Sequence, residues 1–332
     1  MKKYFLLLGA LKLCLCALLG SCVSDDSSLS ARFIGGASSA LLYKNCKAVS
    51  QDEIEFVFSR SVTVKSLAFE PELSVASVEN GETVKIRLAE SPAPGKLITA
   101  DIIAEDDKRN SINVLVTFRT RNDRMPDLII NELCVEYASV TAGRKAEFIE
   151  FKMKSDGNLG AMRLFIIGNS NASKQTIYEF SPAEVKKGDY VVVHLRTFDS
   201  ESKDELGSNL AESGGLNSSP SARDLWIPGN TKLLHKTAIV YVMDQDDNVL
   251  SAVMLRENIG SPWAKDYFTE AAAFLLLKGA WKGDAVPSTG TTNTRTICRD
   301  ETTENTKSAA DWYVTVTSGA TPGSPNNPRR FN

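Results

Sequence analysis

The chain has 332 residues, of which 38 are basic and 41 are acidic, and its formal net charge is -3 at neutral pH. This balance excludes a general electrostatic attraction to nucleic acid or to anionic lipid, so a basic binding face would have to be local. The length is sufficient for two domains, each with its own hydrophobic core.

The N-terminal residues have the three regions of a bacterial signal peptide. Two lysines follow Met1, residues 4–19 are apolar apart from one lysine, and small residues close the leader. The apolar run is shorter than the ~20 residues that a membrane-spanning helix needs. We therefore expect residues 1–21 to be a cleaved leader.

Cys22 directly follows Leu19, Gly20 and Ser21. These four residues resemble the lipobox of bacterial lipoproteins, in which the leader is cleaved before the cysteine and the cysteine sulfur is acylated. The resemblance implies that Cys22 attaches the protein to a membrane of the bacterial cell envelope, on the periplasmic face or at the cell surface. Two or three acyl chains hold a protein stably at a membrane, whereas one chain holds it marginally. An ordinary cleaved leader, with Cys22 left as a free or paired thiol, is the alternative.

The residues that follow Cys22 are rich in serine, glycine and aspartate. Such a composition buries too little apolar surface to order itself, so residues 22–49 are predicted to be a flexible tether. The longest later apolar block, Ala271 to Leu277, is too short to span a membrane. The remainder is therefore expected to be a soluble body outside the cytoplasm.

The cysteines beyond Cys22 are Cys46, Cys134 and Cys298. An odd number allows at most one internal disulfide. Cys134 and Cys298 are the candidate pair, and buried free thiols are the alternative.

Residues 50–120 have the alternating pattern of half-buried antiparallel strands. The segments 54–58 and 111–118 alternate, Asn80-Gly81 has the composition of a type I′ hairpin turn, and the polar run 105–110 predicts a second turn. The order of these segments, with "FVFSRSV" and "VTFRT", resembles the bacterial Ig-like domains of envelope and S-layer proteins. The resemblance implies a small β-sandwich. The charged stretch "RNDRMP", residues 121–126, ends on a proline and predicts a linker.

Residues 127–327 contain a second series of predicted strands. In order, the series reads "IINEL", "EFIEF", "RLFI", "KKGDYVVV", "VMDQDDNVLSAV", "RTICR" and "DWYVTVTSGATPGSPN". This succession resembles the lamin tail domain, an Ig-like β-sandwich also found in secreted bacterial proteins. The whole chain is thus predicted to be all-β, with two tandem Ig-like β-sandwiches and a short tail at residues 328–332.

The second series departs from the lamin tail pattern in two long segments. Residues 201–230 form a polar excursion, which is predicted to be a loop insertion. Residues 261–282 predict an inserted helix, because Ser261 can cap it and Trp263, Tyr267, Ala271, Phe274 and Lys278 follow at helical spacing. We expect this stripe to pack against the core, with a cover over a ligand as the alternative. Binding surfaces tend to lie on such insertions.

Motifs for catalysis and metal binding are weak in this sequence. "GNSNA" places Ser170 in an arrangement that resembles a nucleophile elbow, but the next residues predict a strand where the elbow needs a helix. The chain has two histidines, His194 and His235, and neither lies at a ligand spacing from the other. We therefore assign no catalytic residue, no metal site and no cofactor.

Two groups of carboxylates remain. Asp244, Asp246 and Asp247 lack the glycine and glutamate of an EF-hand, so they predict a solvated turn, with a looser calcium loop as the alternative. Glu147 and Glu150 are three residues apart on a strand, face opposite sides and cannot act as one acid and base pair. The lamin tail resemblance implies a structural role for both, with Glu150 bonded to backbone or to a neighbouring strand.

The expected function is that of a membrane-anchored envelope lipoprotein. It is expected to be a non-catalytic binding or structural module for a protein or glycan partner, with acylated Cys22 as its membrane contact. Nucleic-acid binding is an alternative, because lamin tail domains are found beside nucleases, but the acidic balance of the chain argues against it. An unrecognised hydrolase is the third hypothesis.

Overall fold

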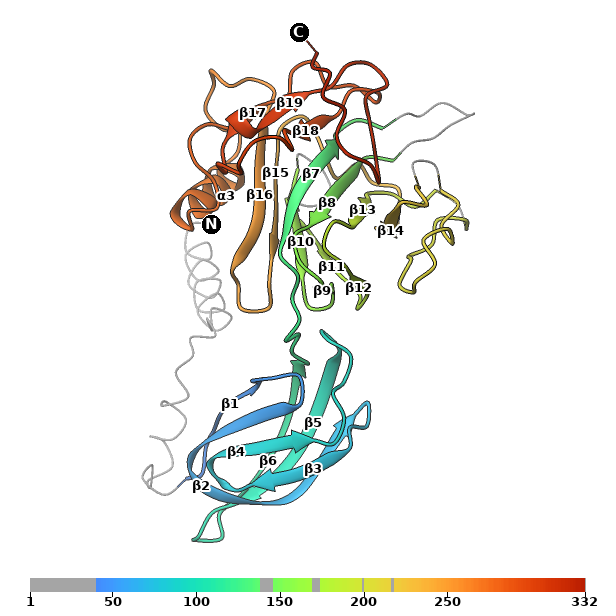
Figure 1. Cartoon of the computed structure of the whole chain (residues 1–332). Helices are drawn as coiled ribbons and strands as arrows, with labels where there is room; N and C mark the ends of the chain where they lie inside the picture. The colour runs from blue at the N-terminus through green and yellow to red at the C-terminus, as the bar shows by residue number, and fades with distance from the viewer. Residues whose placement is uncertain (1–39, 138–145, 169–173, 199, 216–217, 332) are drawn as a thin grey trace, which may run out of the picture.

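The computed structural model describes residues 40–137, 146–168, 174–198, 200–215 and 218–331 (Figure 1). This part of the chain is nearly all-β and contains strands β1 to β19 and one α-helix, α3. Within it, no helix is long and apolar enough to cross a membrane. The predicted leader with Leu19, Gly20, Ser21 and Cys22, and the candidate Ser170, lie outside the described residues.

The first group of strands forms one antiparallel sheet, in the order β3-β4-β2-β5-β6, with β1 added on β2 (Figure 1). We call this sheet and its loops the first unit. Its strands are β1 (Tyr43–Ala48), β2 (Glu53–Glu70), β3 (Val75–Glu79), β4 (Gly81–Leu88), β5 (Leu97–Glu105) and β6 (Ser111–Arg119). The long β2 pairs with β4 in its first half and with β5 in its second half, so the sheet curves around its own core. The centre of that core contains Phe56 and Phe58, which are fully buried.

Two details of the first unit differ from the sequence predictions. The predicted tether ends earlier than residue 49, because Tyr43–Ala48 pairs with β2 and the ring of Tyr43 packs edge-on against Phe58. The prediction of a type I′ turn at Asn80-Gly81 is wrong. Neither residue has the positive φ that this turn requires, and Gly81 pairs with Val62 of β2. The side chain of Asn80 instead accepts a hydrogen bond from the backbone of Val64.

The remaining strands form the second unit, in which two larger sheets share one core. One sheet has the order β14-β13-β8-β7-β18-β19, the other has the order β11-β10-β15-β16-β17, and β9 and β12 form a small pair. The strands are β7 (Leu128–Cys134), β8 (Phe148–Met153), β9 (Gly157–Asn158), β10 (Arg163–Ile167), β11 (Thr176–Glu179), β12 (Glu184–Val185), β13 (Tyr190–His194), β14 (Ala222–Trp226), β15 (Ala238–Met243), β16 (Val249–Arg256), β17 (Val286–Pro287), β18 (Ile297–Arg299) and β19 (Trp312–Val314). Buried residues of both sheets, among them Phe151 and Val240, belong to one hydrophobic cluster.

The polar excursion at residues 201–230 is not a simple loop. It contains β14, which pairs parallel to β13. Buried Arg223 holds the surrounding turns together, because its guanidinium donates to the backbone carbonyls of Glu184, Glu205 and Gly207. The excursion therefore extends the sheet by one strand.

Helix α3 (Asp266–Leu277) lies within the stretch for which the sequence predicts a helix, and it packs on β15 and β16. It begins after Lys265 and has no side-chain cap, so the predicted cap at Ser261 is wrong. The fully buried side of the helix consists of Phe268, Ala271, Ala272 and Leu275. Of the predicted stripe, Trp263 precedes the helix and Lys278 follows it, while Tyr267 and Phe274 are partly buried against the same core.

The structure has Cys134 and Cys298 as free, buried thiols and not as a disulfide. Cys298 lies directly opposite Glu132, so Cys134 is its diagonal neighbour two residues farther along β7. Diagonal neighbours are ~7–8 Å apart between Cα atoms, which exceeds the usual reach of a disulfide. The thiol of Cys134 donates to the carbonyl oxygen of Glu136 instead.

Candidate functional site

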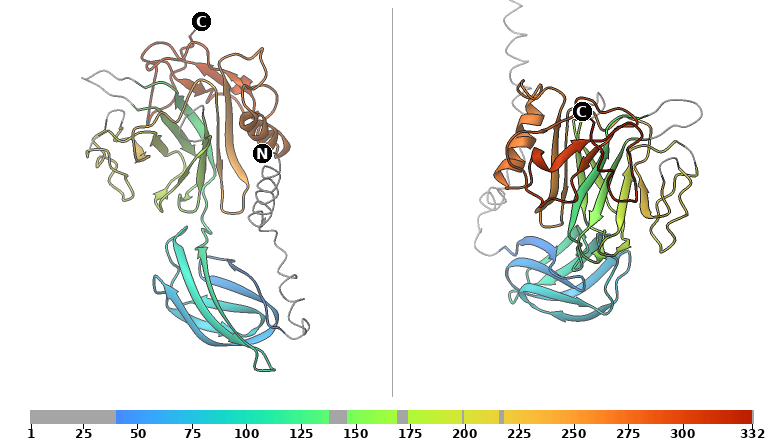
Figure 2. Two further views of the ribbon diagram at one scale, coloured as in Figure 1. Left: turned by 180° about the vertical axis from the view of Figure 1, so that it is seen from behind. Right: turned by 45° about the horizontal axis from the view of Figure 1, so that its top comes forward.

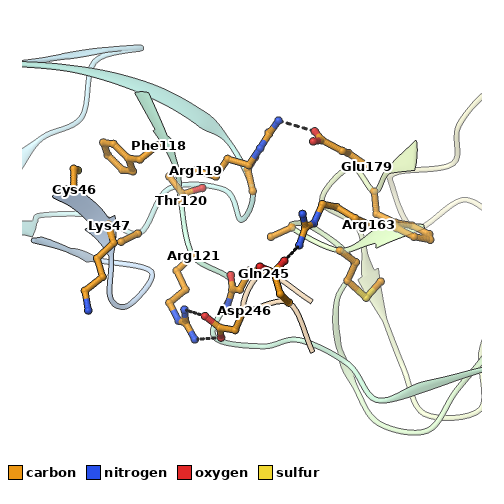
Figure 3. Close-up of a pocket in the computed structure, with 16 residues that line it drawn as sticks. Cys46, Lys47, Phe118, Arg119, Thr120, Arg121, Arg163, Glu179, Gln245 and Asp246 are labelled. Carbon is orange, nitrogen blue, oxygen red and sulfur yellow. Dashed lines mark hydrogen bonds and ion pairs between the residues drawn. The ribbon is translucent and has the colours of Figure 1, made fainter. Parts of the chain in front are cut away.

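A cleft of about 490 Å³ lies where the first unit meets the second (Figure 3). Strand β1 and the end of β6 contribute one wall, with Cys46, Lys47 and Phe118, and β10, β11 and the β15–β16 turn contribute the other. This volume lies within the ~300–1,000 Å³ range of sites for small ligands. The lining combines arginines and carboxylates with a few apolar side chains.

A bidentate ion pair joins the two units at one side of the cleft. The two terminal nitrogens of Arg121 donate to the two carboxylate oxygens of Asp246 at 2.9 and 2.6 Å (Figure 3). This pairing raises the pKa of Arg121 and lowers the pKa of Asp246. Because both side chains are partly exposed, salt will weaken their attraction.

A second ion pair crosses the cleft at a different point. Arg119 of β6 approaches the carboxylate of Glu179 in β11 at 2.7 Å (Figure 3). Within the second unit, Arg163 donates to Asp247 and to the carbonyl oxygen of Asp244. Asp246 and Asp247 are therefore parts of the cleft wall. The carboxylate of Asp244 accepts hydrogen bonds from the backbone N–H groups of Asp246 and Asn248, which closes the turn between β15 and β16. Among the described residues, no group of three or more candidate ligands could hold a metal ion.

The segment 121–126, predicted to be a linker, is bonded to the second unit. The side-chain amide of Asn122 donates to the carbonyl oxygens of Asn158 and Gly160, both at 2.7 Å. The side-chain amide of Gln245 accepts a hydrogen bond from the backbone N–H of Asn122 and donates one to its backbone carbonyl oxygen. These contacts fix the direction in which the chain passes from one unit to the other.

Backbone from both units also meets directly beside the cleft. A Cβ atom placed on Gly160 would lie 2.6 Å from the carbonyl oxygen of Pro94 in the first unit. A Cβ atom on Gly95 would lie 2.5 Å from the backbone nitrogen of Ala161. Only glycine allows such an approach at both positions.

Replacing Gly160 with valine is expected to separate the units at this contact, because the side chain would overlap the Pro94 carbonyl. Trypsin should then cut the chain after Arg121 and Arg124 faster. The cleavage rate should rise roughly tenfold for each ~1.4 kcal/mol of contact free energy lost. Gly207→Ala is the control, because a Cβ atom there meets nothing within 4 Å. Equal cleavage rates for both variants would contradict a tight contact between the units.

The two histidines lie away from the cleft lining. His194 is fully buried, its Nε2 lies 2.7 Å from Asp224, and its ring stacks on Trp226. Asp224 also accepts from the backbone of Ser219. Burial lowers the pKa of His235. The structure therefore places a His–Asp pair in the interior, which the sequence analysis did not predict.

Glu147 and Glu150 have separate partners in the structure, as expected for two carboxylates that do not act as a pair. Glu147 accepts two hydrogen bonds from Arg196, both at 2.7 Å. Glu150 accepts from the side chain of Asn131 at 2.9 Å and from the backbone of Gly323 at 2.7 Å. The predicted bonding of Glu150 to backbone and to a neighbouring strand is confirmed.

Glu132 is a buried carboxylate that the sequence analysis missed. It lies opposite Glu150 in the β7–β8 register and accepts from the backbone of Thr321. Residues 321–326, the "TPGSPN" motif, thus cross the outer side of this sheet and donate backbone hydrogen bonds to both glutamates. The only signal in the sequence is the polar pair Asn131-Glu132 within the otherwise apolar strand "LIINELC".

The glutamate pair predicts an unusual dependence of stability on pH. Burial, and then the nearby charge of Glu132, raise the pKa of Glu150 well above its usual value. A carboxyl group with a raised pKa in the folded state stabilises the fold fully below the unfolded-state pKa, and this stabilisation declines as the pH rises through the folded-state pKa. Wild type should therefore lose this contribution to the free energy of unfolding as the pH rises above the usual range of a glutamate pKa.

Glu150→Gln should remove most of this dependence. The amide lacks one of the two acceptor oxygens, so the variant should be less stable than wild type at pH 5, and the difference should narrow by pH 8. Urea unfolding at both pH values measures the difference, with the exposed Glu304→Gln as the control. A constant difference across this range would contradict the raised pKa.

The sequence of the second unit matches a known protein family. Residues 126–314 match the family described as the TP_1001 protein second domain. The chain belongs to this family. An uncharacterized protein of Treponema pallidum (strain Nichols) is 25% identical over 208 residues, which cover 59% of this chain and 50% of that protein. The chain thus spans about half the length of this curated relative.

Two solved structures show weak similarity to the chain. A DUF4876 family protein from Bacteroides thetaiotaomicron aligns over 86% of this chain and 96% of its own, with 14% identity and a TM-score of 0.30. The N-terminal part of the bacterial S-layer protein SbsC aligns over 46% of this chain and 45% of its own, with 13% identity and a TM-score of 0.25. At these TM-scores, neither structure carries a conclusion about fold or function.

Proposed function

We propose that this protein is a membrane-anchored envelope lipoprotein that acts as a non-catalytic binding module for a protein or glycan partner. In this proposal, acylated Cys22 is the anchor, the first unit is a bacterial Ig-like domain and the second is a lamin tail domain. The observation that carries the proposal is the cleft between the units, whose walls are joined by Arg121–Asp246 and Arg119–Glu179. A cleft with walls from two bonded units is already organised before a partner arrives, which lowers the entropic cost of binding.

The chemistry of the cleft suits a ligand with many polar groups. Arg119 and Arg121 supply donors, while Glu179 and Asp246 supply acceptors within the same lining. Sugar hydroxyls and peptide amides each use both kinds of group. The side chain of Lys47 is 61% exposed and can meet the partner at the mouth of the cleft.

The interior of the second unit also supports a non-catalytic role. His194, Asp224, Glu132 and Glu150 have the side chains that acid–base catalysis uses, but each is fully or almost fully buried. Their hydrogen-bond partners belong to the same unit. They stabilise the fold in this arrangement, and the partner-binding role falls to the cleft.

Two measurements test the two parts of this proposal separately. Mass spectrometry of the N-terminal peptide from membrane fractions should find acyl chains on Cys22, and Cys22→Ser should release the protein from those fractions. A chain that stays unmodified at Cys22 would overturn the anchor.

Crosslinking in intact cells, followed by identification of what is retained, tests the cleft. Asp246→Arg places a like charge against Arg121 and should abolish recovery of the partner, whereas Asp101→Arg, the same change at an exposed position of β5, should preserve it. Equal recovery with both variants would overturn the cleft as the binding site. Retention of DNA, with a steep loss at higher salt, would favour nucleic-acid binding instead.

A further inference from the structure

A second surface of the protein combines exposed leucines with lysines. It lies at α3, on the opposite side of the second unit from β14 (Figures 1 and 2). Leu277 is 87% exposed and Leu276 is 46% exposed at the end of this helix. Ile177 of β11, an edge strand of the sheet on which α3 packs, is 49% exposed. We call these three residues the α3 face.

A row of rings, in which Tyr241 and Phe165 are buried, lies beneath the α3 face and connects its two ends. Phe274 of α3 contacts Tyr241 at 5.8 Å between ring centroids, and Tyr241 stacks on Phe165 at 4.7 Å. Phe165 lies directly opposite Ile177 in the β10–β11 register, so both side chains point to the same side of the sheet. The exposed leucines and Ile177 therefore share one side of the five-stranded sheet.

Cationic side chains surround this apolar row. Lys278 lies over the ring of Phe274 at 5.8 Å, and Lys174 lies over the ring of Tyr267 at 5.9 Å. Lys265 and Lys282 are exposed near the two ends of the helix. Asp266 and Glu270 of α3 and Asp284 beyond its end are exposed acids, so these four lysines exceed the acids around the helix by one. This local excess contrasts with the net negative charge of the chain.

Apolar side chains beside aromatic rings and lysines are typical of surfaces that lie in the interface of a membrane. The apolar side chains enter the boundary between headgroups and acyl chains, and the lysines stay with the lipid phosphates. A sugar or a hydrophilic protein would leave Leu277 unmatched. The positive rim specifically suits an anionic lipid surface.

We propose that the α3 face rests on an anionic phospholipid membrane. The inference deepens the proposed function, because it rests on the protein being held at a membrane through Cys22. With Leu276 and Leu277 in the lipid interface, the body lies against the membrane on its α3 side. The side of the second unit that bears β14 then points away from the membrane.

Site-specific photocrosslinking to lipid tests this contact on the full chain. A benzophenone amino acid replaces Leu277 in one protein and Leu115 in the other, because Leu115 of β6 is also exposed, at 72%. Both proteins are illuminated with vesicles of phosphatidylglycerol and phosphatidylethanolamine. Position 277 should give at least several-fold more lipid adduct than position 115. The excess should disappear with phosphatidylcholine vesicles, or when Lys174, Lys278 and Lys282 are all replaced by glutamine.

Two other outcomes would overturn the proposal. Equal adducts at both positions, or none, would show that the α3 face does not meet lipid. A crosslinked dimer from position 277 would assign the face to a second copy of the chain. A lipid adduct at position 277 in a protein whose Cys22 carries no lipid would overturn the anchor but not the contact. An acylated Cys22 without an adduct at position 277 would overturn the contact but not the anchor.

Discussion

Replacing Arg196 with methionine is expected to lower the free energy of unfolding by ~3–5 kcal/mol. Arg196 and Glu147 form a buried bidentate pair, with side chains that are 5% and 0% exposed. The arginine also lies over the ring of Tyr137 at 3.9 Å and donates to the carbonyl oxygen of Asn230. Methionine fills much of the same space but leaves the Glu147 carboxylate without a compensating charge. Urea unfolding at pH 7 measures the loss.

An exposed pair supplies the matched control. Arg87 lies 3.0 Å from Glu53, and its side chain is 62% exposed. Arg87→Met should change the free energy of unfolding by only ~0–1 kcal/mol, because water already solvates both charges. The double variant Arg196→Met, Glu147→Leu should recover part of the loss, because it removes the unpaired charge. A loss at Arg196 no larger than that at Arg87 would show that the buried pair does not stabilise the fold.

The second large effect is expected at Trp281, just beyond the end of α3. Its side chain is 1% exposed, and its indole nitrogen donates to the carbonyl oxygen of Asp284 at 3.0 Å. Trp281→Ala should cost ~3–5 kcal/mol, because it leaves a large cavity and an unpaired carbonyl. Amide hydrogen exchange in α3 should accelerate most, since the tryptophan helps to hold the helix to the sheet.

Leu277→Ala serves as the control for this change. Its side chain is mostly exposed, so the substitution should alter the free energy of unfolding by no more than ~0.5 kcal/mol. If exchange accelerated equally across the second unit in Trp281→Ala, the helix would not be a separately stabilised element. If the alanine variant matched wild type in stability, the cavity argument would be wrong.

Local patterns in the sequence were sufficient where a strand or turn depends on its own residues. The segment "IEFVF" alternates because every second side chain enters the core of the first unit, and Ile54, Phe56 and Phe58 are indeed buried. The predicted turn at residues 105–110 is confirmed, because Asp106 accepts hydrogen bonds from the backbone of Lys108 and Asn110. The helix near residue 270 was also predictable, from the helical spacing of Tyr267, Ala271 and Phe274.

Other elements gave weak signals because their partners are distant in the chain. Strand β1 reads "YKNCKA", which is mostly polar, and its pairing with β2 is what makes it a strand. Strand β14 lies within a polar excursion and depends on β13 and on the carbonyl contacts of Arg223. Neither set of contacts is visible in a local pattern.

The sequence by itself determined the all-β class and the positions of most strands, because these follow from alternation and from short local motifs, and the lipid anchor at Cys22 stays a prediction. Only the tertiary structure decided the cleft, the buried charged groups and the α3 face. Arg121 and Asp246 are 125 residues apart, and Glu132 and Thr321 are 189 residues apart. Ion pairs and buried hydrogen bonds depend on distances in space, which the folded sheets set and which no local spacing encodes.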